Sequence, residues 1–315
     1  MLSPIPMHVS RIFKDYALLW SMVVGVFLSP WAYRLAFLLP YIMFIMLSLS
    51  YTRIAPSDVK MSRVHIVLFV IQWVFGVGAY FLLRIWDEIL AQGLALIILT
   101  PTAVSASVIT AMMGGSMGFI IASLIIGNVT MSLLAPPLLS SLYPDTGLGY
   151  LATVMQILSK VSLLLIMPIV LIWGLRYRMP RIHDALSKRA GWTFYFWCFS
   201  LVIITSNTIR FFKEHQELDL RYGTIIALSV FVVCLLLFVI GRKTGKVMGI
   251  LAVNSGQALG QKNTVLAIWM ALTFMNPVVS VIPSFYVIWQ NVVNAIQLAH
   301  YRRDTAAQTL NPPKL

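Results

Sequence analysis

Apolar runs of membrane-spanning length follow one another along most of the chain, and short polar segments separate them. A helix needs roughly 20 apolar residues to cross a bilayer core. On this criterion the pattern predicts ten spans, at 16–32, 35–52, 64–83, 89–113, 117–142, 152–175, 191–212, 222–240, 247–274 and 277–299. We therefore expect an all-α, polytopic membrane protein, since a helix satisfies its own backbone hydrogen bonds in lipid.

Polar insertions interrupt two of these spans. In the ninth span, residues 255–264 (SGQALGQKNT) place a lysine, amides and glycines between apolar runs. Gly256 and Gly260 would let the helix unwind at this depth. In the fourth span, residues 100–107 (TPTAVSAS) contain Pro101, which removes a backbone donor and disfavours a continuous helix. The sequence thus predicts breaks at 101–105 and 260–263.

The interrupted spans occupy the same place, the fourth, in each half of five. Paired interruptions of this kind are typical of an inverted-repeat transporter whose binding site lies between them. The predicted organisation is one transmembrane unit, 1–315, with a first repeat at about 14–143, a second at about 150–303 and a tail at 304–315. For the fourth span alone, an ordinary proline kink is the alternative.

Composition and charge agree with a membrane protein. Hydrophobic residues make up 59% of the chain, charged residues 10%, and the mean hydropathy is +0.87. The net charge of +13 could suit nucleic acid, but the basic residues cluster between spans. Sixteen of them fall on the side that holds both termini and five on the other. By the positive-inside rule, both termini are expected in the cytoplasm of a cell-membrane protein that has no nucleic-acid partner.

Lys262 is the main candidate for chemistry. A cation at mid-depth costs roughly 2.5 to 3.5 kcal/mol on insertion scales, so such a residue suggests a functional site. All ten acidic residues lie at span ends or in loops, which leaves no carboxylate at that depth. Helix N-termini near Ser105 and Asn263 would add N–H groups, an arrangement that favours an anion. The alternative is a lysine that snorkels to the interface.

Several motifs, in order and well spaced, resemble one family. They are LPYIMFIML at 39–47 with APSD at 55–58, the segment 101–115, IMPIV at 166–170, GQKNT at 260–264, the segment 277–283 and WQN at 289–291. Together they resemble the bile acid:sodium symporter family over nearly the whole chain. The resemblance implies a panel domain and a core domain, with helices four and nine crossing at mid-membrane. Residues 254–256 (NSG) offer another alignment of the ninth span, but 260–264 places the break more centrally.

The resemblance also implies a sodium site, which this chain matches only in part. Gln72 matches a sodium-site glutamine, whereas the family's acidic ligand falls at Ala258 and a nearby glutamine at Lys262. The remaining candidates for an ion site are Gln72, Ser107 and Gln261. Because sodium prefers oxygen ligands with negative charge, this set predicts that transport does not depend on sodium.

We therefore expect a secondary transporter of a small organic anion, such as a bile acid, pantoate or a related carboxylate or sulfonate, working by alternating access. A non-transporting membrane sensor or binding protein on the same fold is the alternative. An enzyme, a metal centre and a cofactor are not expected, and the partners are the anion and the lipid bilayer. The predicted substrate-binding residues are Thr102, Ser105, Ser107, Thr110, Lys262, Asn263, Thr264, Gln290 and Asn291.

Overall fold

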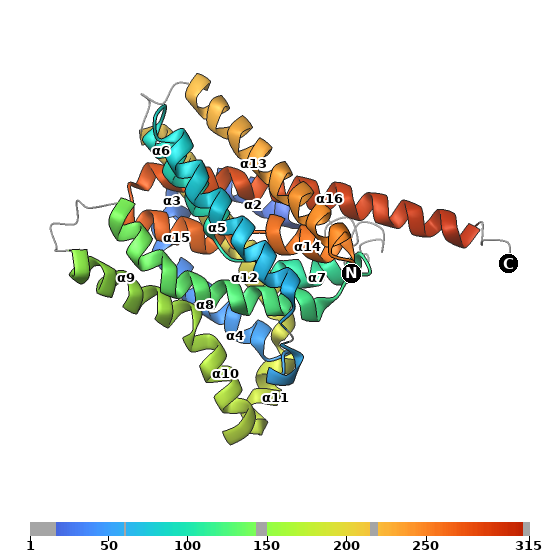
Figure 1. The fold of residues 1–315 in the computed structure, drawn as a ribbon. Coiled ribbons are helices and arrows are strands. Elements are labelled where there is room, and N and C mark those ends of the chain that lie inside the picture. The colour runs from blue at the N-terminus through green and yellow to red at the C-terminus, as the bar shows by residue number, and fades with distance from the viewer. Residues whose placement is uncertain (1–16, 60, 143–149, 215–219, 311–315) are drawn as a thin grey trace, which may run out of the picture.

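The computed structural model describes residues 17–59, 61–142, 150–214 and 220–310, and every regular element in this part is a helix (Figure 1). The α-helices are α2 (Ala17–Phe27), α3 (Ser29–Ala32), α4 (Leu39–Tyr51), α5 (Arg63–Leu83), α6 (Glu88–Leu99), α7 (Ser105–Met112), α8 (Met117–Leu142), α9 (Tyr150–Leu165), α10 (Met167–Arg178), α11 (Pro180–Lys188), α12 (Thr193–Glu214), α13 (Leu220–Val247), α14 (Ala252–Gly260), α15 (Thr264–Phe274) and α16 (Val281–Leu310). Short 3₁₀ helices are η1 (Tyr33–Leu38), η2 (Pro56–Asp58), η3 (Ala190–Trp192) and η4 (Pro277–Ser280). The all-α prediction is confirmed.

Seven helical stretches in the described part are long and apolar enough to cross a membrane. They are Ser29–Tyr51, Arg63–Leu83, Met117–Ser141, Tyr150–Arg178, Ala190–Arg210, Arg221–Val247 and Pro277–Asp304. The predicted fourth and ninth spans are each divided into two short helices, and α2 is also short. A multi-pass membrane protein follows from these stretches, while the count of ten spans stays a prediction.

Two predicted span boundaries are wrong. Span nine was placed from residue 247, but α13 continues to Val247 and α14 starts only at Ala252. The residue that ends α13 is Gly249, whose φ of +72° is left-handed and so terminates a helix. The helix therefore extends as far as Val247. The sequence predicts the gap between the first two spans at 33–34, but α2 ends at Phe27 and α3 begins at Ser29. Pro30, in the first turn of α3, favours a helix start there.

Close packing of α13 against α14 depends on glycine. Gly241 and Gly245 of α13 and Gly256 and Gly260 of α14 each leave no room for a side chain, and a Cβ on Gly260 would lie 2.4 Å from Cγ of Phe238. Small residues four apart let two membrane helices approach at backbone distance. The prediction that the ninth span unwinds at Gly256 is therefore wrong, because α14 stays helical through it, whereas the helix does end at Gly260.

The two halves of the ninth predicted span lie inside the bundle. Figure 1 shows α14 and α15 following one another through its middle, while α16 runs beside them and projects beyond the other helices. In α14 every residue from Asn254 to Gly260 is buried. The broken helix therefore faces protein on most sides, which is the condition under which irregular backbone persists at membrane depth.

Candidate functional site

Both helix breaks fall where the sequence predicts them. The helix α6 ends at Leu99 and α7 begins at Ser105, while α14 ends at Gly260 and α15 begins at Thr264. Residues 254–256 are helical, so the ninth span breaks at 261–263 and not at 254–256. Proline explains the first break, and the polar segment after Gly260 forms the second.

The two breaks are joined through their backbones. The Ala103 N–H donates to the Gln261 carbonyl at 2.9 Å, and the Asn263 N–H donates to the Pro101 carbonyl at 2.9 Å. These bonds form an antiparallel bridge between Thr102 and Lys262. Backbone groups freed by the breaks thus satisfy one another at a depth where lipid offers no partner. The chain crosses itself at this point.

Side chains from neighbouring helices hold the second break in place. Thr102 Oγ1 donates to the Ala258 carbonyl at 2.7 Å, and Tyr286 OH donates to the Gly260 carbonyl at 2.6 Å. Gln290 Oε1 accepts from the Lys262 N–H at 3.0 Å. Tyr286 and Gln290 lie one helical turn apart on α16, so this helix fixes the backbone on both sides of Gln261.

The Lys262 side chain is buried without a partner. Its exposed fraction is 0%, and its Nζ atom has no hydrogen-bond partner in the described part of the chain. The same holds for Gln261 Oε1, although Gln261 Nε2 donates to Ser105 Oγ at 2.8 Å. A buried ammonium without a counter-charge is costly, so its presence at the junction points to a site that an anion can occupy.

A cavity of about 30 Å³ adjoins this lysine. Ser105, Lys262, Asn263, Thr264 and Gln290 contribute to the wall formed by the crossing. The first residues of both α7 and α15 face the cavity, so two helix N-termini meet there. Asn263 also caps α15, because its Oδ1 accepts from the Leu266 N–H at 3.2 Å. Positive ends of helix dipoles and an ammonium therefore surround one small space.

The rest of the cavity lining is apolar. Met43, Met46 and Leu47 of α4 and Trp197 of α12 contribute to it. Sequence reasoning missed these residues, because methionine, leucine and tryptophan in membrane helices carry no signal beyond packing. The cavity thus pairs a cationic, hydrogen-bonding wall with a hydrophobic one.

Some predicted residues lie away from the cavity wall. Ser107 Oγ donates to the carbonyl of Val104, the residue just before α7, at 2.9 Å. Asn291 Nδ2 donates to the carbonyl of Val287, one turn earlier in α16, at 2.8 Å. Thr110 is fully buried in α7. Their roles in substrate binding stay predictions.

Within the described ranges, the candidate ion ligands Gln72, Ser107 and Gln261 do not share a hydrogen-bond partner. Gln72 Nε2 donates to the carbonyls of Leu99 and Thr100 at 2.6 and 3.2 Å, and so caps the end of α6. Ser107 and Gln261 bond elsewhere, as described above. Among the described residues, no group of three His, Cys, Asp or Glu side chains could hold a metal ion.

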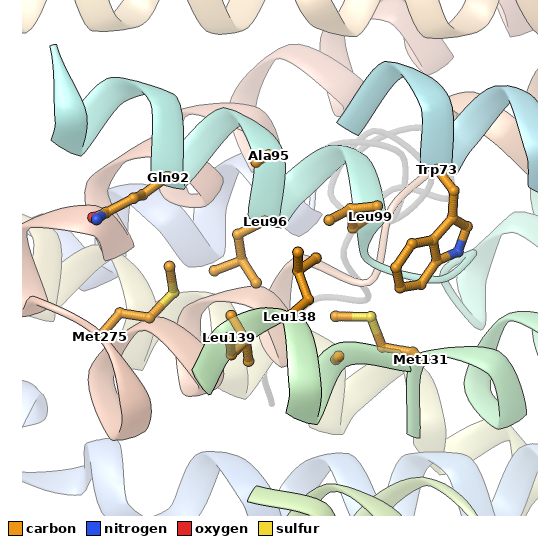
Figure 2. Close-up of a pocket in the computed structure, with 10 residues that line it drawn as sticks. Trp73, Gln92, Ala95, Leu96, Leu99, Met131, Leu138, Leu139 and Met275 are labelled. Carbon is orange, nitrogen blue, oxygen red and sulfur yellow. The ribbon is translucent and has the colours of Figure 1, made fainter. Parts of the chain in front are cut away.

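A second cavity, drawn in Figure 2, has a different character. It has a volume of about 10 Å³ and lies between α6 and α8, beside Trp73 and Met275. Its walls are apolar apart from Gln92, whose Nε2 donates to Glu88 Oε1 at 2.9 Å. A water molecule needs roughly 10 to 15 Å³ and several polar partners. We therefore regard this space as a packing defect rather than a binding site.

Two broken helices that meet at their breaks, within a multi-pass helical membrane protein, define a transporter type of architecture. The sequence matches the model of the SBF-like CPA transporter family over residues 57–291, more than half of the chain, and the protein belongs to that family. This confirms the resemblance to bile acid:sodium symporters, and the family is one of membrane transporters. No curated protein gives a significant match to the sequence.

Proposed function

We propose that the protein is a secondary transporter that carries a small organic anion across the cell membrane by alternating access. The observation that carries the proposal is the Lys262 ammonium, buried and unpaired where two helix N-termini meet. Each of these three sources favours negative charge, and they converge on one cavity.

The two walls of the cavity suit an anion with an apolar body. The carboxylate or sulfonate would bind Lys262, with Ser105, Asn263 and Thr264 as neutral donors. Its carbon skeleton would lie against α4 and Trp197. Bile acids, pantoate and related compounds have this division into charged and apolar parts.

Cavity size supports movement between two conformations. At about 30 Å³ the space holds little more than one water molecule. An organic anion is several times larger, so α4 and α12 must move relative to the crossing for it to bind. Movement of the core that holds the crossing helices against the panel helices would supply that motion, with both termini in the cytoplasm.

Lys262 also bears on ion coupling. In this proposal its ammonium supplies the positive charge that relatives take from bound sodium. Ala258 cannot offer a carboxylate, and its carbonyl already accepts from Thr102. Transport should therefore proceed without sodium, and Gln72, Ser107 and Gln261 would serve structure rather than ion binding.

Reconstitution into liposomes tests the function. Purified protein should show saturable, counterflow-competent uptake of a labelled carboxylate or sulfonate, equal in sodium and in choline buffers. Tight binding of the anion without any flux would instead support the membrane sensor. A protein that neither binds nor moves any anion in the screen would contradict the assignment of the site.

A further inference from the structure

Five of the buried side-chain atoms that lack a hydrogen-bond partner in the described part of the chain belong to the crossing or to helices beside it. Thr110 Oγ1, Gln257 Oε1 and Asn294 Nδ2 have no hydrogen-bond partner among the described residues, like Gln261 Oε1 and Lys262 Nζ at the crossing. All five residues belong to α7, α14, α16 or the break itself. Native interiors pair almost all such atoms, so two unpaired ones on side chains in contact, Gln257 and Asn294, point to a polar occupant beside them.

Gln257, Asn294 and Gln297 form an amide cluster. Gln257 Nε2 donates to Asn294 Oδ1 at 2.9 Å and to Gln297 Oε1 at 3.3 Å. The exposed fractions of Gln257 and Asn294 are 0% and 5%. The acceptor Gln257 Oε1 and the donor Asn294 Nδ2 remain unpaired. A group that both donates and accepts, such as a water molecule or a solute hydroxyl, could bind both atoms.

One face of α16 connects this cluster to the crossing. Tyr286, Gln290, Asn294 and Gln297 follow one another at spacings of four, four and three residues, which places them on one side of a helix. They bond in turn to the Gly260 carbonyl, the Lys262 N–H and the Gln257 side chain. A continuous polar seam therefore runs along α16 from the Lys262 site.

The contact between α14 and α16 is made by long side chains. Toward α13, α14 packs at backbone distance through its glycines. Toward α16, the hydrogen bonds of Gln257 are between side chains. The hydrogen bonds between Gln257 and α16 therefore depend on three amide side chains and on no backbone group. Polar residues buried at membrane depth are characteristic of water-accessible paths.

The seam continues to the turn between α7 and α8. Asn254 Oδ1 accepts from the Ser116 N–H at 2.8 Å. A Cβ on Gly115 would lie 2.5 Å from both Asn254 Oδ1 and Thr110 Cγ2, so these two residues flank the same point. Asn254 precedes Gln261 by seven residues, which is on the order of 10 Å along a helix. In the proposed topology this turn faces the cytoplasm.

We propose that this seam is the aqueous route between the Lys262 site and the cytoplasm, and that Gln257, Asn294 and Gln297 form a second, uncharged station on it. The station binds water or the hydroxyl and amide groups of the passing solute, and its side-chain hydrogen bonds close the route in the described conformation. The inference rests on the proposed transport function, but its first test needs no substrate.

Labelling of introduced cysteines measures access to the seam. In a background with Cys198 and Cys234 replaced by alanine, Asn294→Cys should react with an anionic methanethiosulfonate applied from the cytoplasmic side. Val293→Cys is the matched control, because Val293 is also buried and lies one residue away on a different face of α16. The Asn294→Cys variant should react about tenfold faster, since opening of the seam exposes only its side chain. Equal rates would overturn the route.

A second test separates the station from the Lys262 site. The double variant Gln257→Met, Asn294→Leu keeps side-chain volume and removes the unpaired amide atoms. Anion binding to the purified protein should stay within about twofold of wild type, while flux falls about tenfold, because the barrier on the route rises by more than 1 kcal/mol. Unchanged flux in the folded variant would overturn the station.

The outcomes distinguish the two proposals. Labelling of Asn294→Cys in a wild-type-like protein that moves no anion would reject transport and keep the aqueous route. The opposite outcome combines normal flux in the wild type and in the double variant with an Asn294→Cys thiol that does not react. That outcome would reject the route and keep transport.

Discussion

Replacement of Lys262 by glutamine is the most informative perturbation of the site. Lys262 is fully buried and unpaired, so it costs stability in the empty protein. Its ammonium would form a charge-assisted hydrogen bond only with a bound anion. The structure thus predicts opposite effects of Lys262→Gln on stability and on affinity.

The expected loss of affinity follows from the geometry. Hydrogen bonds to charged groups contribute about 1.5 to 3 kcal/mol, and 1.4 kcal/mol is a tenfold change in Kd. Unit charges about 4 Å apart in an effective dielectric of about 20 set a ceiling near 4 kcal/mol. Lys262→Gln should therefore weaken anion binding by about 10- to 100-fold. Removal of an unpaired buried charge should stabilise the empty protein by about 1 to 3 kcal/mol.

Thermal unfolding with and without anion measures both effects at once. The melting temperature of empty Lys262→Gln should rise above that of wild type, and the further rise on adding anion should shrink. Lys160→Gln is the control, because Lys160 is an exposed lysine of α9 whose ammonium lies over the Phe274 ring, 5.6 Å from its centroid. That variant should change neither quantity appreciably.

Two results would refute this reasoning. A lysine with a purely structural role would, on substitution, lower stability and affinity together. A sodium-coupled mechanism would show wild-type uptake collapsing when choline replaces sodium, while Lys262→Gln transports normally. In that case an ion site must be built from Gln72 and backbone carbonyls.

Three further outcomes are expected. Reporter fusions after Lys314 and at Lys213, near the end of α12, should report opposite sides of the membrane, and identical sides would reject the ten-span count. Ser105→Cys and Asn263→Cys should react with a small aqueous thiol reagent and be shielded by bound anion, whereas inert thiols at both sites would mean that the cavity never opens. Gly260→Ala should destabilise the fold, since the new Cβ would lie 2.4 Å from Phe238, and added Phe238→Ala should recover part of the loss; no recovery would place the strain elsewhere.

Local signals explain which features could be predicted. Pro101 and the polar segment around Lys262 are unfavourable within a continuous apolar helix, so both breaks were visible in the sequence. The close packing of Gly260 against α13 could not be predicted from the sequence, because glycine permits both unwinding and close packing. The residue that decides between them, Phe238, lies on another helix.

The site was predictable only on its polar side. Lys262, Asn263 and Gln290 stand out against apolar neighbours, whereas Met43 and Trp197 resemble any packing residue of a membrane helix. Which of these side chains face one another depends on tertiary packing. The spacing of Gln290, Asn294 and Gln297 did carry a usable signal, since polar residues on one face of a membrane helix rarely face lipid.

The bridge between Thr102 and Lys262 holds the crossing together through the backbone alone, whereas the side chain of Lys262 supplies the charge of the site. Its two hydrogen bonds use only main-chain atoms, so the bridge does not depend on the side chain at position 262. A lysine can stand there in one protein and a glutamine in another while the crossing keeps its shape. The selectivity of such a carrier can therefore change through single substitutions at its centre, without the compensating changes that a side-chain-built joint would demand.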